Sequence, residues 1–126
     1  MPALERVAGI RVVATPEALD GARWTGDAVS VVRIAPDEAL GLGASAVTVD
    51  DPDAIVEAET GFVVAYLDGN HRRALAAHVD WKLPTEPGAL GQGKIAGVPV
   101  RLLVGTPSLL VTSASYAEEL RSRLGW

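Results

Sequence analysis

The stretch of residues 78–104, HVDWKLPTEPGALGQGKIAGVPVRLLV, constrains the fold of this chain more than any other. Two strand-like runs near its end, residues 92–96 and 98–104, are separated by Gly97 alone, which predicts a β-hairpin. Hairpin strands pair antiparallel, so the sheet cannot be purely parallel. Pro99 lacks a backbone N–H donor, which predicts that the second strand begins at a sheet edge. The prolines and glycines before the hairpin predict a turn-rich loop.

The first half of the chain favours short strands, turns and one short helix. Thr15 followed by Pro16 is typical of a helix N-cap and first helical residue. Gly26 and Asp27 predict a turn, and the Gly, Ser, Thr and acidic residues of 43–53 predict a mobile loop. The strands expected in this half cover residues 7–13, 28–34 and 39–42.

The second half alternates strands with two clear helices. Residues 61–67, GFVVAYL, form the most apolar strand candidate, and Asp68 can cap a helix over residues 71–79. A strand over 109–112 precedes a last helix that ends near residue 124. Together with the hairpin, this order predicts a single α+β domain over residues 1–126, with a mixed or mostly antiparallel sheet and helices packed on one face.

Composition excludes several classes of function. The chain has no cysteine, which excludes disulfides, zinc–thiolate sites and cysteine nucleophiles. Its two histidines, His71 and His78, are too few for a histidine-rich metal site. The net charge of −5 opposes non-specific binding to nucleic acid.

The N-terminal sequence and hydropathy also limit the cellular context. Glu5 and Arg6 interrupt the N-terminal segment where a secretory signal would be apolar. No apolar run approaches the ~18 residues of a membrane span. We therefore expect a cytoplasmic protein that binds neither nucleic acid nor membrane.

No motif predicts catalysis or metal binding. The run 88–94, GALGQGK, resembles a phosphate loop, but Ile95 follows where that loop requires Ser or Thr. The acids of residues 50–59 lack the glycine and ligand spacing of a calcium loop, so they favour a solvated acidic segment. His71 and His78 lie about 10 Å apart along the predicted helix, too far to share one metal ion. We therefore predict no catalytic residue and no metal ligand.

Three tryptophans stand out in a chain with few aromatic residues. Trp24, Trp81 and Trp126 fall in predicted loops or at the last position. A large aromatic side chain in such a place serves either as a core plug or as an anchor in a protein–protein interface. All three are candidate interface residues.

Four segments in the same order resemble the gamma subunit of heterotetrameric sarcosine oxidase. That family has the folate-binding fold of the aminomethyltransferase of glycine cleavage. The resemblance extends over residues 31–124. Its segments are RIAPDEALGLG (33–43), HRRALAAHVDWKLP (71–84), PGALGQGKIAGVPVRLL (87–103) and LLVTSASYAEELRSRL (109–124).

The resemblance implies a small subunit without catalytic activity that binds the large flavoprotein subunit of a heteromeric oxidase. FAD, FMN, NAD and tetrahydrofolate are then expected on partner subunits, and no cofactor on this chain. One alternative is an independent binder of a folate-like ligand, in which Asp80 or Glu86 would pair with a pterin ring. Another is a homo-oligomer formed through exposed strand edges.

Overall fold

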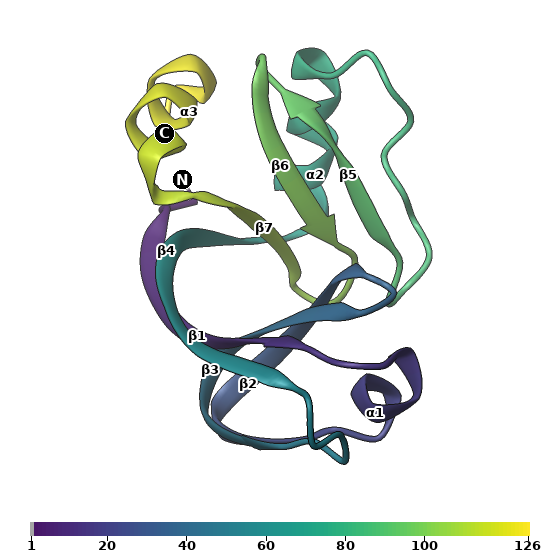
Figure 1. Cartoon of the computed structure of the whole chain (residues 1–126). Coiled ribbons are helices and arrows are strands. Elements are labelled where there is room, and N and C mark those ends of the chain that lie inside the picture. Colours follow the sequence, from purple (N-terminus) through teal and green to yellow (C-terminus); the bar gives the residue numbers. More distant parts are fainter. Residues whose placement is uncertain (1) are drawn as a thin grey trace. The chain divides into compact units, whose positions relative to one another are not determined.

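The computed structural model describes residues 2–126, which form seven strands and a few short helices (Figure 1). The hydrogen-bonded strand order is β2-β3-β1-β4-β7-β6-β5. The chain divides into two compact units: unit 1 comprises the N-terminal residues up to Arg6 and residues 61–126, and unit 2 comprises residues 7–60. The prediction of an α+β fold with a mostly antiparallel sheet is confirmed.

Unit 2 is built around β3, which pairs antiparallel with both β1 and β2. Val12, Leu19 and Ala39 are buried in its small aliphatic core, against which Trp24 packs. The core therefore joins β1, α1 and β3. The elements of this unit are β1 (Glu5–Val13), α1 (Pro16–Asp20), β2 (Arg23–Ala35), β3 (Glu38–Thr48) and the first part of β4 (Ile55–Leu67).

Two predictions in unit 2 are wrong. The expected turn at residues 26–27 lies inside β2, and most of the expected loop over 43–53 belongs to β3. Gly26 pairs with Ala44 and Ser30 pairs with Leu42, so β2 contains a bulge between them. Residues typical of turns here bend a strand without ending it.

The expected start of α1 is confirmed. The Thr15 side chain accepts a hydrogen bond from the Ala18 backbone N–H (3.2 Å), as an N-cap does, and Pro16 is the first helical residue. Asp51 adds a longer-range connection. Its carboxylate accepts from the backbone N–H groups of Thr15 (3.0 Å) and Asp53 (2.9 Å). One acidic residue of the 50–59 segment therefore holds a turn against the start of the helix.

In unit 1 both α-helices pack on one face of a four-stranded antiparallel sheet. Leu75 of α2 and Leu120 of α3 are fully buried in the same cluster as Val100, Leu102 and the alternate residues of the neighbouring strands. The elements after β4 are α2 (Gly69–Leu75), a 3₁₀ turn (Ala76–His78), β5 (Leu90–Ile95), β6 (Val98–Leu103), β7 (Ser108–Ser113), a 3₁₀ turn (Ala114–Tyr116) and α3 (Ala117–Leu124).

The hairpin of β5 and β6 is confirmed, with Ile95 opposite Val98 and a two-residue turn between them. Both turn residues, Ala96 (φ 51°) and Gly97 (φ 80°), have positive φ, as a type I′ turn requires. The β6–β7 ladder begins only at Arg101, so Pro99 lies where β6 has a neighbour on one side only. The missing N–H of this proline therefore disturbs no ladder.

Replacing Ala96 by asparagine should stabilise the fold. Alanine in the left-handed region costs about 1 kcal/mol, whereas Asn-Gly is the preferred pair for this turn. We expect Ala96→Asn to raise the free energy of unfolding by about 0.5–1 kcal/mol, measured by denaturant titration. Ala96→Val is the opposing variant, because a β-branched side chain is worse than alanine at positive φ. A loss of stability in Ala96→Asn would contradict the role assigned to the turn.

A reciprocal cap begins α2. The backbone N–H of His71 donates to the Asp68 carboxylate (2.8 Å), and the backbone N–H of Asp68 donates to Nδ1 of His71 (3.2 Å). The hydrogen bond from His71 N–H is the main cause that holds the pKa of Asp68 below its ordinary value of 3.8. The predicted cap at Asp68 is confirmed, although the helix begins two residues earlier than expected.

This cap predicts a specific acid dependence of stability. Because the folded-state pKa of Asp68 is lowered, its stabilisation is complete above the unfolded-state pKa and is lost as the pH falls through the folded-state pKa. Between pH 7 and pH 3, the thermal unfolding midpoint of Asp68→Asn should therefore fall by fewer degrees than that of the wild type. Asp80→Asn, which changes an exposed aspartate outside any cap, should follow the wild-type profile. Identical profiles for all three proteins would contradict the assignment.

Candidate functional site

A cavity of about 430 Å³ opens on the face of the unit 1 sheet opposite the aliphatic core. We call it the hairpin cavity, because β5 and β6 supply much of its lining. The side chains that give it chemical character are Phe62, Gln92, Lys94, Arg101, Ser113 and Tyr116.

The strand register brings the polar groups of the hairpin cavity to one face. Gln92 on β5 lies opposite Arg101 on β6, and Arg101 in turn lies opposite Val111 on β7. Lys94 follows Gln92 by two residues and therefore points to the same side. Directly opposed side chains in such ladders have Cβ atoms about 5 Å apart. Gln92 and Arg101 are thus direct neighbours, and Lys94, which lies opposite Pro99, is a diagonal neighbour of Arg101 at about 7–8 Å.

The hairpin cavity is electrostatically unbalanced. Lys94 and Arg101 contribute two positive charges, and no aspartate or glutamate of the described residues lines it. Nε of Arg101 is buried and has no hydrogen-bond partner in the described part of the chain. An unpartnered buried donor costs free energy, so this guanidinium can bind an acceptor more favourably than an exposed arginine can.

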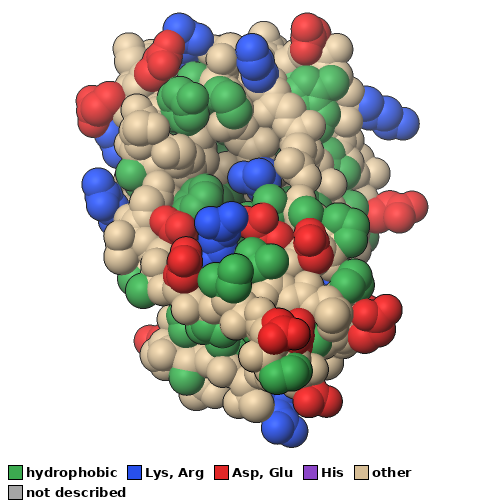
Figure 2. Space-filling model, viewed as in Figure 1, with side chains coloured by type: hydrophobic (Ala, Val, Ile, Leu, Met, Phe, Trp, Pro, Cys, Tyr) green, Lys and Arg blue, Asp and Glu red, His purple; other side chains and the backbone are tan. Residues whose placement is uncertain are grey.

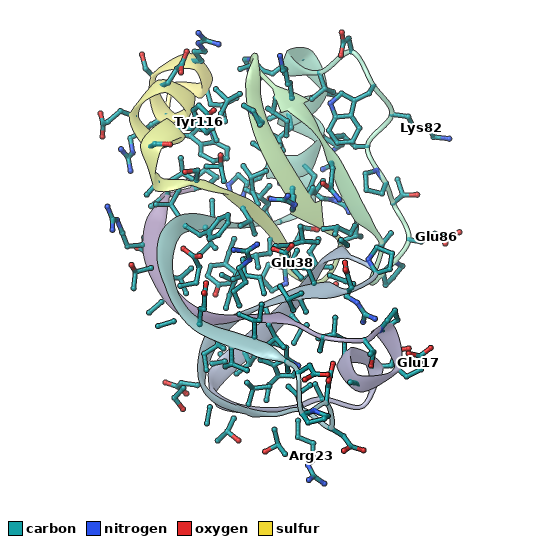
Figure 3. All side chains as sticks on the ribbon, in the orientation of Figure 1. Glu17, Arg23, Glu38, Lys82, Glu86 and Tyr116 are labelled. Carbon is teal, nitrogen blue, oxygen red and sulfur yellow. The ribbon has the colours of Figure 1, made fainter. Side chains whose placement is uncertain are left out.

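Two aromatic rings give the hairpin cavity apolar walls. Phe62 comes from β4, where it pairs with Ser113 of β7, and Tyr116 comes from the turn before α3. Tyr116 is 39% exposed, and Figure 3 shows it beside α3, close to β7. The cavity therefore combines a cationic floor with flat apolar sides, the composition of many small-ligand sites.

Trp81 packs on the glycines of β5. Its indole Nε1–H donates to the backbone carbonyl of Lys94 (2.8 Å). A Cβ placed on Gly93 would lie 2.5 Å from Cε2 of Trp81, and one placed on Gly91 would lie 3.2 Å from Cζ3 of the same ring. The glycine-rich run that resembled a phosphate loop therefore gives a flat strip of backbone that accommodates an indole ring.

The other two tryptophans also pack within their own units. Trp24 lies over Gly41 of β3, where a Cβ would come within 2.3 Å of the ring. Trp126 packs against the unit 1 core and lines a second hollow of about 260 Å³ with His71 and His78. All three indoles are partly buried. Their part in a partner interface remains a prediction.

The two acids considered for pterin binding lie apart from the hairpin cavity. Asp80 and Glu86 are exposed residues of the loop between α2 and β5, and neither lines the cavity. Figure 3 shows Glu86 pointing outward from that loop. The structure does not bring these carboxylates together with Lys94 and Arg101.

The residues of the hairpin cavity were not predicted from the sequence. One signal was present in the run VPVRLLV. Arg101 interrupts this apolar strand between Val100 and Leu102, so its side chain points to the face of the sheet opposite theirs. A charged residue at that position implies a polar environment on the second face of the sheet. The contribution of Phe62 and Tyr116 has no comparable local signal.

Within residues 2–126 no group of three histidine, aspartate or glutamate side chains is placed to hold a metal ion. None of the helices in the same range is long and apolar enough to cross a membrane. Comparison with known proteins found no matching protein-family model and no matching curated protein.

Proposed function

We propose that this chain is a non-catalytic, cytoplasmic small subunit of a heteromeric flavoenzyme of the sarcosine-oxidase type. Its role is to bind the large flavoprotein subunit. The observation that supports a binding role is an exposed apolar pair, Ile55 and Val56, on a strongly acidic unit. The type of complex comes from the resemblance of the four sequence segments between residues 33 and 124.

The apolar pair lies at the beginning of β4. Ile55 is 55% exposed and Val56 is 51% exposed, and Glu57 and Ala58 after them are exposed as well. Neighbouring residues of a strand point to opposite faces, so this end of β4 presents apolar surface on both sides. Exposed aliphatic side chains beside polar residues can serve as anchors in a protein–protein contact.

The charge around this pair determines what partner would fit. Unit 2 carries ten acidic and three basic side chains, a formal charge of −7, whereas unit 1 carries six acidic and eight basic ones, or +2. Figure 2 shows acidic and hydrophobic side chains close together on the molecular surface. A partner surface with an apolar centre and a basic rim would be complementary to unit 2.

The flavins, NAD and tetrahydrofolate of such an enzyme would belong to the partner subunits. The alternative of an independent folate-like binder requires a carboxylate that faces the pterin ring. Asp80 and Glu86, the two carboxylates considered for that role, are exposed loop residues and do not line the hairpin cavity. Their placement therefore gives the pterin-binding alternative no support.

Purification of the tagged chain from its own cell, at its natural expression level, tests this proposal. We expect a larger chain with flavin absorbance to co-purify in a fixed ratio. The double variant Ile55→Ser/Val56→Ser should lose that chain, because both side chains are exposed and their replacement leaves the core intact. Tyr66→Ser is the matched control, since Tyr66 is 54% exposed but belongs to unit 1.

One result would contradict the subunit role, and another would contradict its assignment to unit 2. One is recovery of the wild-type chain alone or only as a homo-oligomer, determined by light scattering. The other is retention of the flavin-bearing chain by the double variant. In the second case the contact would lie elsewhere on the molecule, and unit 2 would not be the binding surface.

A further inference from the structure

We propose that the hairpin cavity binds a small aromatic carboxylate. The carboxylate would accept hydrogen bonds from Arg101 and approach Lys94, and the aromatic ring would lie beside Phe62 and Tyr116. This site is independent of the partner role proposed above, because it lies in unit 1 and uses different residues.

The unpartnered Nε of Arg101 is the first argument. Arginine has five N–H donors in a fixed planar arrangement that matches two carboxylate oxygens. The buried Nε of Arg101 has no acceptor among residues 2–126. Lys94, also in the lining, adds a second positive charge, and none of the described residues in that lining is an aspartate or glutamate. An anionic ligand would remove this imbalance.

The walls of the hairpin cavity are the second argument, and they distinguish among anions. Phe62 and Pro99 form apolar surface beside the cations, and Tyr116 adds a ring with a hydroxyl group. An inorganic anion would leave this apolar surface in contact with water, whereas an aromatic carboxylate would cover it. The volume of about 430 Å³ lies within the range of small-ligand pockets.

The third argument concerns how the site is built. Gln92, Lys94 and Arg101 lie on paired strands whose opposite face packs into the aliphatic core. Trp81 fixes β5 from that opposite face through its hydrogen bond to the Lys94 carbonyl. The polar groups therefore stand on a rigid hairpin, which lowers the entropy cost of ordering them around a ligand.

Binding of benzoate to the full chain tests the proposal. We would measure it by calorimetry and by the shift of the thermal unfolding midpoint, at constant ionic strength. Benzoate should bind and raise the midpoint, whereas benzyl alcohol, which has the ring without the charge, should not. Inorganic phosphate, which has the charge without the ring, should bind at least about tenfold more weakly than benzoate.

Variants then assign the binding to the hairpin cavity. Arg101→Met keeps much of the side-chain volume and should weaken benzoate binding by about tenfold or more. Without ligand, its unfolding midpoint should equal or exceed that of the wild type, because a buried donor without a partner has been removed. Lys94→Gln should weaken benzoate binding by a smaller factor. Lys82→Met, at an exposed lysine outside the cavity, should leave the affinity unchanged.

Several results would overturn the proposal. They are a lack of benzoate binding, equal affinity for phosphate and benzoate, unchanged affinity in Arg101→Met, or a lower ligand-free midpoint in that variant, which would show a structural role for the arginine. Should Arg101→Met fail to fold, the ratio of benzoate affinities between Lys94→Gln and Lys82→Met decides the matter. A ratio of one would refute the site.

Discussion

Replacing Gly9 by alanine is expected to lower the free energy of unfolding by about 3 kcal/mol. A Cβ at this position of β1 would lie 2.4 Å from the Gly41 carbonyl oxygen and 3.2 Å from the Leu42 Cα. Both atoms belong to the backbone of β3, which cannot rotate away as a side chain can. The added methyl group would therefore push β1 and β3 apart over their paired residues.

Urea titration of Gly9→Ala beside Gly21→Ala provides the measurement for this prediction. Gly21 lies just after α1 in the same unit, and a Cβ there would be 3.7 Å from the nearest atom outside its chain neighbours, the Glu17 carbonyl oxygen. Its φ of −94° is open to any residue, so we expect a change within about 1 kcal/mol. Equal destabilisation by the two variants would show that β1 and β3 are not in close contact at Gly9.

Gly93→Ala is expected to cost about 2–3 kcal/mol, for a different reason. Here the obstacle is the indole of Trp81, with three ring atoms within 2.8 Å of the added Cβ. The ring must leave its place, and its hydrogen bond to the Lys94 carbonyl is then lost. At Gly69, at the start of α2 in the same unit, an added Cβ would meet only Nη1 of Arg73, at an ordinary contact distance of 3.7 Å, so Gly69→Ala should be neutral or slightly stabilising.

A double-mutant cycle tests whether the Trp81 side chain is what opposes a methyl group at Gly93, in contrast to the backbone that opposes one at Gly9. Trp81→Ala alone should destabilise unit 1, because a partly buried indole and its hydrogen bond are removed. In that background Gly93→Ala should cost little, which gives a coupling free energy of about 2 kcal/mol. Additive effects would mean that Trp81 does not lie on Gly93. No comparable rescue exists for Gly9, because its neighbour is backbone.

The parts of the fold that depend on local chemistry could be predicted from the sequence. The β5–β6 hairpin, the N-cap at Thr15 and the cap at Asp68 each rest on residues within a few positions of one another. The length of β2 and β3 could not be predicted in this way. The positive φ of Gly43 (86°) and the register shift after Gly26 belong to a bulge that exists only because the two strands meet.

Some residues of the candidate site could likewise be predicted from the sequence, and others could not. The alternation around Arg101 places its side chain opposite the core face, and this is readable from the strand itself. That Phe62 and Tyr116 line the same cavity as this arginine depends on the order of β4, β7 and β6, which the sequence does not reveal. The glycines beneath Trp81 resemble a phosphate loop for the same reason. Their spacing indicates a strip of backbone without side chains, but it does not reveal that the indole of Trp81 covers this strip.

The distribution of the tryptophans gives each unit its own optical reporter. Trp24 stacks on a strand of unit 2, and Trp81 stacks on a strand of unit 1, so each ring would move into water when its own unit unfolds. With Trp126 replaced by phenylalanine, two variants that retain only Trp24 or only Trp81 would report the two units separately by fluorescence, and circular dichroism of the same variants would report the whole chain. Within each variant, coincident fluorescence and circular dichroism curves would show one cooperative molecule, and separate curves would show two units that unfold independently. The packing of Trp24 and Trp81 thus allows the cooperativity of unfolding to be measured by fluorescence.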